Sequence, residues 1–187
     1  KAYSTASKYG IQASEYMEAV YEYTKAGFQD NADAMAELST KAMLVGDTTA
    51  AVADKFLIAG NAAWNYGKNV EELSLLVDKA DYINNKYATT FDKIAEGFPR
   101  VASVASMAGM SAEETMAALG TITATTQETA SRASTALRAL ILNILGDTTT
   151  EVEDGVTTTV EEIESLRDAL QKYAPDVVAA ADATGSL

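Results

Sequence analysis

The residues that could do chemistry in this sequence are carboxylates, because its 187 residues include no histidine and no cysteine. Histidine-activated nucleophiles, imidazole zinc sites and thiolate chemistry are therefore excluded. Two adjacent pairs, Glu71-Glu72 and Glu113-Glu114, leave glycoside cleavage by two carboxylates to be considered. Neighbours on a helix point about 100° apart, so we interpret both pairs as helix-start residues that complement the helix dipole.

An acidic stretch near the C-terminus has part of the spacing of a calcium-binding loop, since Glu161 follows Gly155 by six residues. The other positions do not fit, because Thr150 and Val152 stand where oxygen ligands are required. We interpret this stretch as a solvated linker. No glycine-rich phosphate-binding motif occurs in the sequence either. The sequence thus predicts no catalytic, cofactor-binding or metal-binding residue, and no enzyme.

Two further groups of side chains could serve binding. Arg132 and Arg138 lie on one predicted helix without interleaved aromatic residues, and we expect them to be solvated or paired with acidic neighbours. Tyrosines and one tryptophan either form a partner surface or fill helix–helix contacts. We expect Trp64 in the core, and at least one of Tyr21 and Tyr23 exposed, because they are two positions apart on a helix.

Periodicity predicts that these residues are positioned by helices throughout. Breaker residues recur between segments of helical length, and capping residues precede several of them: Asp30, Asp47, Asn69, Ser111 and Thr159. Glutamate follows three positions after the last three, as in a capping box. The predicted helices are 13–26, 31–45, 48–66, 70–84, 90–108, 112–124, 128–145 and 160–173, with a ninth near 176–183.

The predicted fold class is all-α: a compact multi-helix domain of about eight short helices, mostly with antiparallel neighbours because the connections are short. Its core is expected to include Phe91, Ile94, Phe98, Leu119, Leu137, Leu140, Ile141 and Ile144. The helix at 128–145 is expected to be the most buried, and Pro99 to kink or break the helix at 90–108. The unit lengths vary too much to predict a solenoid.

The domain organisation follows from a change in composition after Gly146. A helical domain over 1–146 precedes a threonine-rich, acidic linker over 147–158 and a C-terminal helical segment over 159–187. The chain opens at Lys1 without an initiator methionine, and we therefore expect a trimmed or internal fragment.

Charge narrows the function classes. A net charge of −13 with a sequence pI near 4.3 opposes binding to nucleic acid or to anionic membranes. The longest apolar stretch, Ala139 to Leu145, is too short to span a bilayer.

Several motifs in residues 10–146 carry a resemblance to a known family. The main ones are a Gly-Met-Ser-Ala-Glu-Glu helix start at 109–114, continuing to Gly120, and the segment Ala133–Arg138. Further segments are Tyr16–Gly27, Ala32–Gly46, Asn85–Ala95 and Phe98–Ala102. Together they resemble the core region of phage tail tape measure proteins of the lactococcal-phage type. Two departures are Ser134, where the family usually has glycine, and the polar segment Lys79–Tyr82, and both bear on close helix packing.

The resemblance implies a structural virion protein that occupies the tail, takes part in tail assembly and length determination, and leaves ahead of the DNA. Its implied partners are tail tube subunits, tail assembly chaperones and tail tip proteins, and its location is the virion tail, after assembly in the host cytoplasm. No catalytic residue comes with the resemblance. Two alternatives stay open: a helical interaction module of a bacterial surface or secreted protein, and a non-catalytic accessory domain of a muralytic enzyme. The sequence leaves the oligomeric state undetermined.

Overall fold

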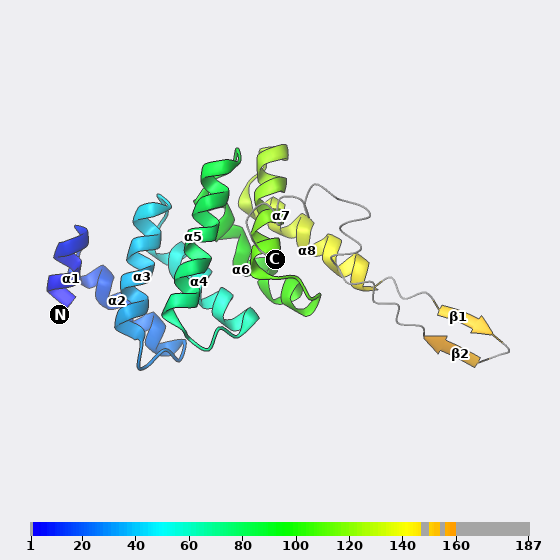
Figure 1. The fold of residues 1–187 in the computed structure, drawn as a ribbon, viewed down its shortest axis with the longest axis horizontal. Coiled ribbons are helices and arrows are strands. Elements are labelled where there is room, and N and C mark those ends of the chain that lie inside the picture. Colours follow the sequence, from blue (N-terminus) through cyan, green and yellow to red (C-terminus); the bar gives the residue numbers. More distant parts are fainter. Residues whose placement is uncertain (1, 147–149, 154–155, 160–187) are drawn as a thin grey trace.

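The computed structural model describes residues 2–146, 150–153 and 156–159, and residues 2–146 fold as helices joined by short connections (Figure 1). The helices are α1 (Ala2–Tyr9), α2 (Ala13–Lys25), α3 (Ala32–Val45), α4 (Ala50–Trp64), α5 (Val70–Lys86), α6 (Phe91–Met107), α7 (Ala112–Thr126) and α8 (Ala130–Gly146). The predicted all-α class is confirmed, and so are the seven helices predicted between residues 13 and 145. α1 was not predicted, because its eight residues carry no capping signal.

Two of the predicted helix starts are confirmed in atomic detail. The Asn69 side chain accepts hydrogen bonds from the backbone N–H groups of Glu71 and Glu72 at the start of α5. At the start of α7, Ser111 and Glu114 form the predicted capping box. Each start satisfies donors that the helix itself leaves without a partner.

Two other predicted starts are wrong by one or two residues. α3 is preceded by Asn31 and not Asp30, and α4 by Thr49 and not Asp47. Thr49 has extended backbone and accepts from the N–H of Val52, whereas Asp47 has a left-handed φ of 46° in the preceding turn. The helix at the predicted Thr159 start lies outside the described residues.

The chain alternates between two layers of helices. Within one layer α2 contacts α4, α4 contacts α6 and α6 contacts α8; within the other α1, α3, α5 and α7 contact one another in series. Each helix also packs against the next one along the chain. Figure 1 shows the resulting row of helices from α1 at one end to α8 at the other. This alternation resembles the stacking of helix pairs in repeat proteins, although the unit lengths vary.

Polar contacts fix the direction of the helices within a layer. Thr48, before α4, donates to the carboxylate of Asp92 at the start of α6. At the other ends of the same helices, Ser106 donates to the carbonyl of Ala63 at 2.6 Å. α4 and α6 therefore run in the same direction, which requires α5 to run back between them.

The core lies between the layers and is centred on α4, α6 and α7. Rings of Phe56, Phe91 and Phe98 meet there, with centroid separations of 5.8 Å and 5.0 Å from Phe56. Helices approach closely where glycine faces a large side chain. A Cβ at Gly60 would lie 2.6 Å from Leu76, so the α4–α5 contact depends on the missing side chain.

α8 is less buried than predicted. Leu137 and Ile141 are in the core, but Leu140 is 43% exposed, so the prediction that it belongs to the core is wrong; Ile144 is partly buried and packs against the core. α6 and α7 each bury more residues than α8 does. The cause is position: among the described helices α8 is the last of its layer, with α6 and α7 as its neighbours on one side.

Pro99 lies inside α6, which continues from Phe91 to Met107, so the helix is not broken there. Proline removes only one backbone donor, and the buried residues on both sides, among them Phe98 and Val101, hold the helix together through the core.

The stretch predicted as a linker, 147–158, contains regular structure. β1 (Thr150–Glu153) and β2 (Val156–Thr159) pair as antiparallel strands, with Thr150 opposite Thr159. Threonine and valine favour strands, and the prediction of an open loop there gave this too little weight. The predicted helices at 160–173 and 176–183, and with them the C-terminal segment 159–187 beyond Thr159, lie outside the described residues.

Candidate interaction surface

The carboxylate pairs singled out in the sequence have structural roles. Glu71 and Glu72 begin α5, and Glu114 accepts a hydrogen bond of 2.8 Å from the backbone N–H of Ser111. Glu113 forms an ion pair with Lys79, which joins α7 to α5. Both pairs therefore act at helix starts, as interpreted from the sequence.

No group of three or more acidic residues in the described part of the chain is placed to hold a metal ion. Asp154, Gly155 and Glu161 of the calcium-like loop lie outside the described residues. None of the described helices is both long and apolar enough to cross a bilayer.

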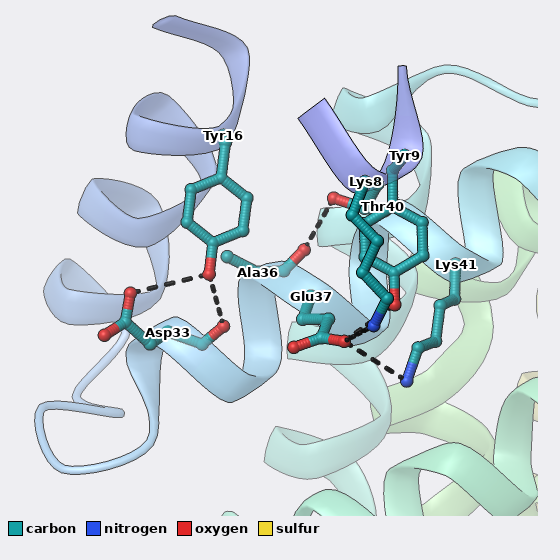
Figure 2. Close-up of polar contacts among 8 residues, drawn as sticks. All are labelled: Lys8, Tyr9, Tyr16, Asp33, Ala36, Glu37, Thr40 and Lys41. Atoms are coloured by element: carbon teal, nitrogen blue, oxygen red, sulfur yellow. Dashed lines mark hydrogen bonds and ion pairs between the residues drawn. The ribbon is translucent and has the colours of Figure 1, made fainter. Parts of the chain in front are cut away.

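A polar cluster joins α1 to α3 at Glu37 of α3 (Figure 2). Its carboxylate accepts from Tyr9 Oη at 2.7 Å and from Lys8 Nζ at 3.1 Å, both on α1, and lies 3.7 Å from Lys41 Nζ. The hydrogen bond from Tyr9, followed by that from Lys8, lowers the pKa of Glu37. These contacts with a single carboxylate fasten α1 to α3.

Beside this cluster, Figure 2 shows Tyr16 reaching from α2 to the first turn of α3. Its hydroxyl donates to the carbonyl of Asp33 at 2.9 Å while its ring is buried. α2 is thus held against α3 by a buried ring with a bonded polar end, as expected for a buried tyrosine.

A second polar cluster lies deeper, between α2, α3 and α4. Ser39 donates to the carboxylate of Asp54, and the Tyr23 hydroxyl is buried nearby without a hydrogen-bond partner among the described residues. Burial, first, and the negative charges of Glu22 and Glu18 raise the pKa of Asp54. Burial and the Asp54 charge raise the pKa of Tyr23 well above its ordinary value.

Above Asp54 an open groove of about 610 Å³ runs between α2 and α4. We call it the acidic groove. Its lining residues are Glu15, Glu18, Ala19, Glu22, Met43, Thr49, Ala50, Ala51, Asp54, Lys55 and Ile58. Four carboxylates face one ammonium group, and the remaining side chains except Thr49 are apolar. A groove of this size with an apolar floor and charged rim is of the kind that receives a ligand or a partner segment.

The exposed side of α8 has the opposite character. Arg138, Leu142 and Leu145 are spaced i, i+4 and i+7 and are all exposed, so they form one continuous stripe, which we call the α8 stripe. Arg138 makes one long hydrogen bond of 3.4 Å, to the carbonyl of Arg100. α8 contains no aspartate or glutamate.

The structure also shows where the remaining residues considered from the sequence lie. Arg132 pairs with Glu128 at 3.0 Å, as expected. Trp64 is partly buried, stacked on Phe98 at the edge of the core, with its indole N–H bonded to a carbonyl. Tyr23 is fully buried and Tyr21 is 61% exposed.

The sequence reasoning did not identify either surface. The glutamates at 15, 18 and 22 have the spacing of one helix face, which was a signal for an acidic edge on α2. That this edge meets Asp54 across a groove depends on how α2 and α4 pack, which the sequence alone does not specify.

Comparison with known protein families gave a match over nearly the whole chain. The family model described as phage-related minor tail protein matches residues 1–186. No curated protein and no solved structure matches the chain.

Proposed function

We propose that this chain, which belongs to the family of phage-related minor tail proteins, is a folded helical segment of a tape measure protein. Family membership makes it a phage tail protein and favours this reading over a bacterial surface module. The observation that carries the proposal is the family match over residues 1–186, together with the tape-measure-like motifs within it.

The residues that carry the resemblance have packing and capping roles. Ser111 and Glu114 close the capping box of α7, and Leu137 is buried. Ser134, where the family usually has glycine, is fully buried, and a Cβ at Gly97 would lie 3.6 Å from its Cβ. This is an ordinary van der Waals distance, so the contact of α6 with α8 at Ser134 does not require glycine at position 97. A motif set of this kind supports a structural protein without catalytic residues.

The fold bears on how such a segment would act in a length-determining protein. A continuous helix over 10–146 would be about 200 Å long at 1.5 Å per residue. The longest described helices instead have 17 residues, which is about 25 Å each, and they fold back on one another. In the conformation described, each residue therefore adds much less length than the 1.5 Å that it would add in a continuous helix. We therefore propose that this segment contacts partners during assembly or ejection, and that other parts of the protein measure length.

An in-frame deletion of residues 10–146 in the parent phage tests this proposal, with tails imaged by electron microscopy. We expect loss of infectivity or of assembly, with any tails that form shortened by far less than 200 Å. Infective particles whose tails are shortened by the full rod length would contradict it.

The proposed partners are tail tube subunits, tail assembly chaperones and tail tip proteins, met first in the host cytoplasm and then in the virion tail. We expect neither muralytic activity nor binding to duplex DNA, because the chain has no histidine and a net charge of −13. Peptidoglycan turnover, or salt-sensitive retention of DNA by the purified chain, would contradict these expectations.

A further inference from the structure

We propose that the α8 stripe of one copy docks into the acidic groove of a second copy, so that this chain associates head to tail. The two surfaces lie on different helices, and each has the chemistry that the other lacks. The inference concerns self-association and does not depend on the tape measure role.

The acidic groove presents an apolar floor between two walls of unequal charge. Ala19, Met43 and Ile58 supply apolar contact, while Glu15 and Glu18 are exposed along the α2 wall. Glu18 makes no ion pair with any described residue. An occupant that brings a positive group to Glu18 would relieve the repulsion among these carboxylates.

The α8 stripe meets those requirements. Leu142 is 47% exposed and Leu145 is 37% exposed, and both can bury apolar surface on docking. Arg138 lies one turn before Leu142 on the same face and forms no ion pair with a described residue. Among the described residues its side chain bonds to the carbonyl of Arg100 at 3.4 Å, and a carboxylate would offer a stronger, charge-assisted bond in its place.

Charge selects α8 as the occupant. The net charge of −13 opposes contact between most parts of two copies. α8 has no acidic residue, and Arg138 forms no ion pair with a described residue, whereas Arg132 is already paired with Glu128; the approach of Arg138 to the acidic groove is therefore attractive. An apolar and charged helix face with anchors at i, i+4 and i+7 in a groove is also an established mode of helix recognition.

The contact joins two different surfaces, so it is heterologous and can be extended by further copies. In Figure 1 α2 lies near one end of the row of helices and α8 at the other. Docking would therefore bring the α8 end of one copy to the α2 end of the next. A groove of about 610 Å³ gives a small interface, and we expect dissociation constants of roughly 1–100 μM, weakened by salt.

Sedimentation velocity of the full chain over a range of concentrations tests the proposal. The native chain should associate in a concentration-dependent way at low salt. Arg138→Glu should raise the dissociation constant about tenfold or more, since it places like charges opposite each other. Glu18→Arg should do the same from the other side. Both positions are exposed, so neither change should alter the helical circular dichroism.

Mixing the two variants provides the decisive measurement. In the mixture, the native groove of the Arg138→Glu chain can receive the native stripe of the Glu18→Arg chain. The altered stripe of the first variant and the altered groove of the second are also complementary in charge. Association should therefore return to within a few-fold of the native level. Lys86→Glu is the control variant. It changes the net charge by the same amount as Arg138→Glu, but at an exposed position of α5, and it should associate like the native chain.

A native chain that stays monomeric at all concentrations would overturn the proposal. So would single variants that associate normally, or variants that stay apart when mixed. Association that survives both charge reversals would assign the contact to another surface and equally reject the one proposed.

Discussion

Two adjacent residues of α8 differ strongly in burial, and this difference predicts different effects on stability. Ile141 is 1% exposed, whereas Leu140 is 43% exposed on the other side of the same turn. Replacing each with alanine keeps the helix-forming tendency high and removes a similar volume. Any difference in stability between the two variants therefore reports on packing.

The magnitudes follow from the structure. Ile141→Ala removes three carbon groups from the core, worth about 2.4 kcal/mol at 0.8 kcal/mol each, and leaves a cavity that adds to the cost. We expect a loss of about 3 kcal/mol in the free energy of unfolding, or about 6–12 °C in Tm. Leu140→Ala should cost less than about 1 kcal/mol, because nearly half of the residue is already in water.

Urea unfolding followed by helical circular dichroism, analysed with a common denaturant slope, gives the comparison. Leu140→Asp is a useful third variant. A buried Leu140, as predicted from the sequence, would make this substitution unfold the protein, whereas the exposed position should accept it. Equal losses for both alanine variants, or an unfolded Leu140→Asp chain, would refute the arrangement of α8 described above.

Three further changes test other contacts. Gly46→Ala should destabilise by about 1–3 kcal/mol, because its Cβ would lie 2.1 Å from the Phe91 ring; Gly97→Ala, with no atom nearer than 3.3 Å, is the matched control in thermal melts. Ser111→Ala should cost about 1 kcal/mol in urea unfolding by removing a helix cap. The raised pKa of Asp54 means that its protonated form favours folding, a contribution present in full below the unfolded pKa and lost as pH rises through the folded pKa. The native chain should therefore gain stability relative to Asp54→Asn on acidification from neutral pH, and a constant difference across pH would contradict this.

Local features of the fold were predictable because they depend on neighbouring residues. The capping box at Ser111 and the cap at Asn69 need only the side chain and the next turn of backbone, so the sequence pattern was sufficient. The start of α4 was misplaced because Asp47 and Thr49 are both good caps. The choice between them depends on the turn after α3, where Asp47 adopts a left-handed conformation.

Burial was less predictable because it depends on which helix comes next in space. The apolar residues of α8 span a wide arc of its surface: Leu137, Leu140, Ile141 and Ile144. An arc of this width suits a central helix with neighbours on several sides. In the described structure it ends a layer, and only the side facing α6 and α7 is covered. The same composition is thus compatible with a central or a terminal helix, and only the packing distinguishes them.

The exposure of the acidic groove and of the α8 stripe likewise depends on which helices lie next to each other. A stripe of leucines at helical spacing is most simply interpreted as core, and a run of glutamates on a helix as solvated surface. Here the stripe is exposed because α8 is the last described helix of its layer. The glutamates line a groove because the packing of α2 against α4 leaves space between these helices. The terminal helix α8 presents an apolar and basic face, and the acidic groove presents apolar and acidic side chains. Both surfaces are exposed in the described structure. Each gains most from the other, since docking buries leucine surface and pairs Arg138 with a carboxylate in the same step.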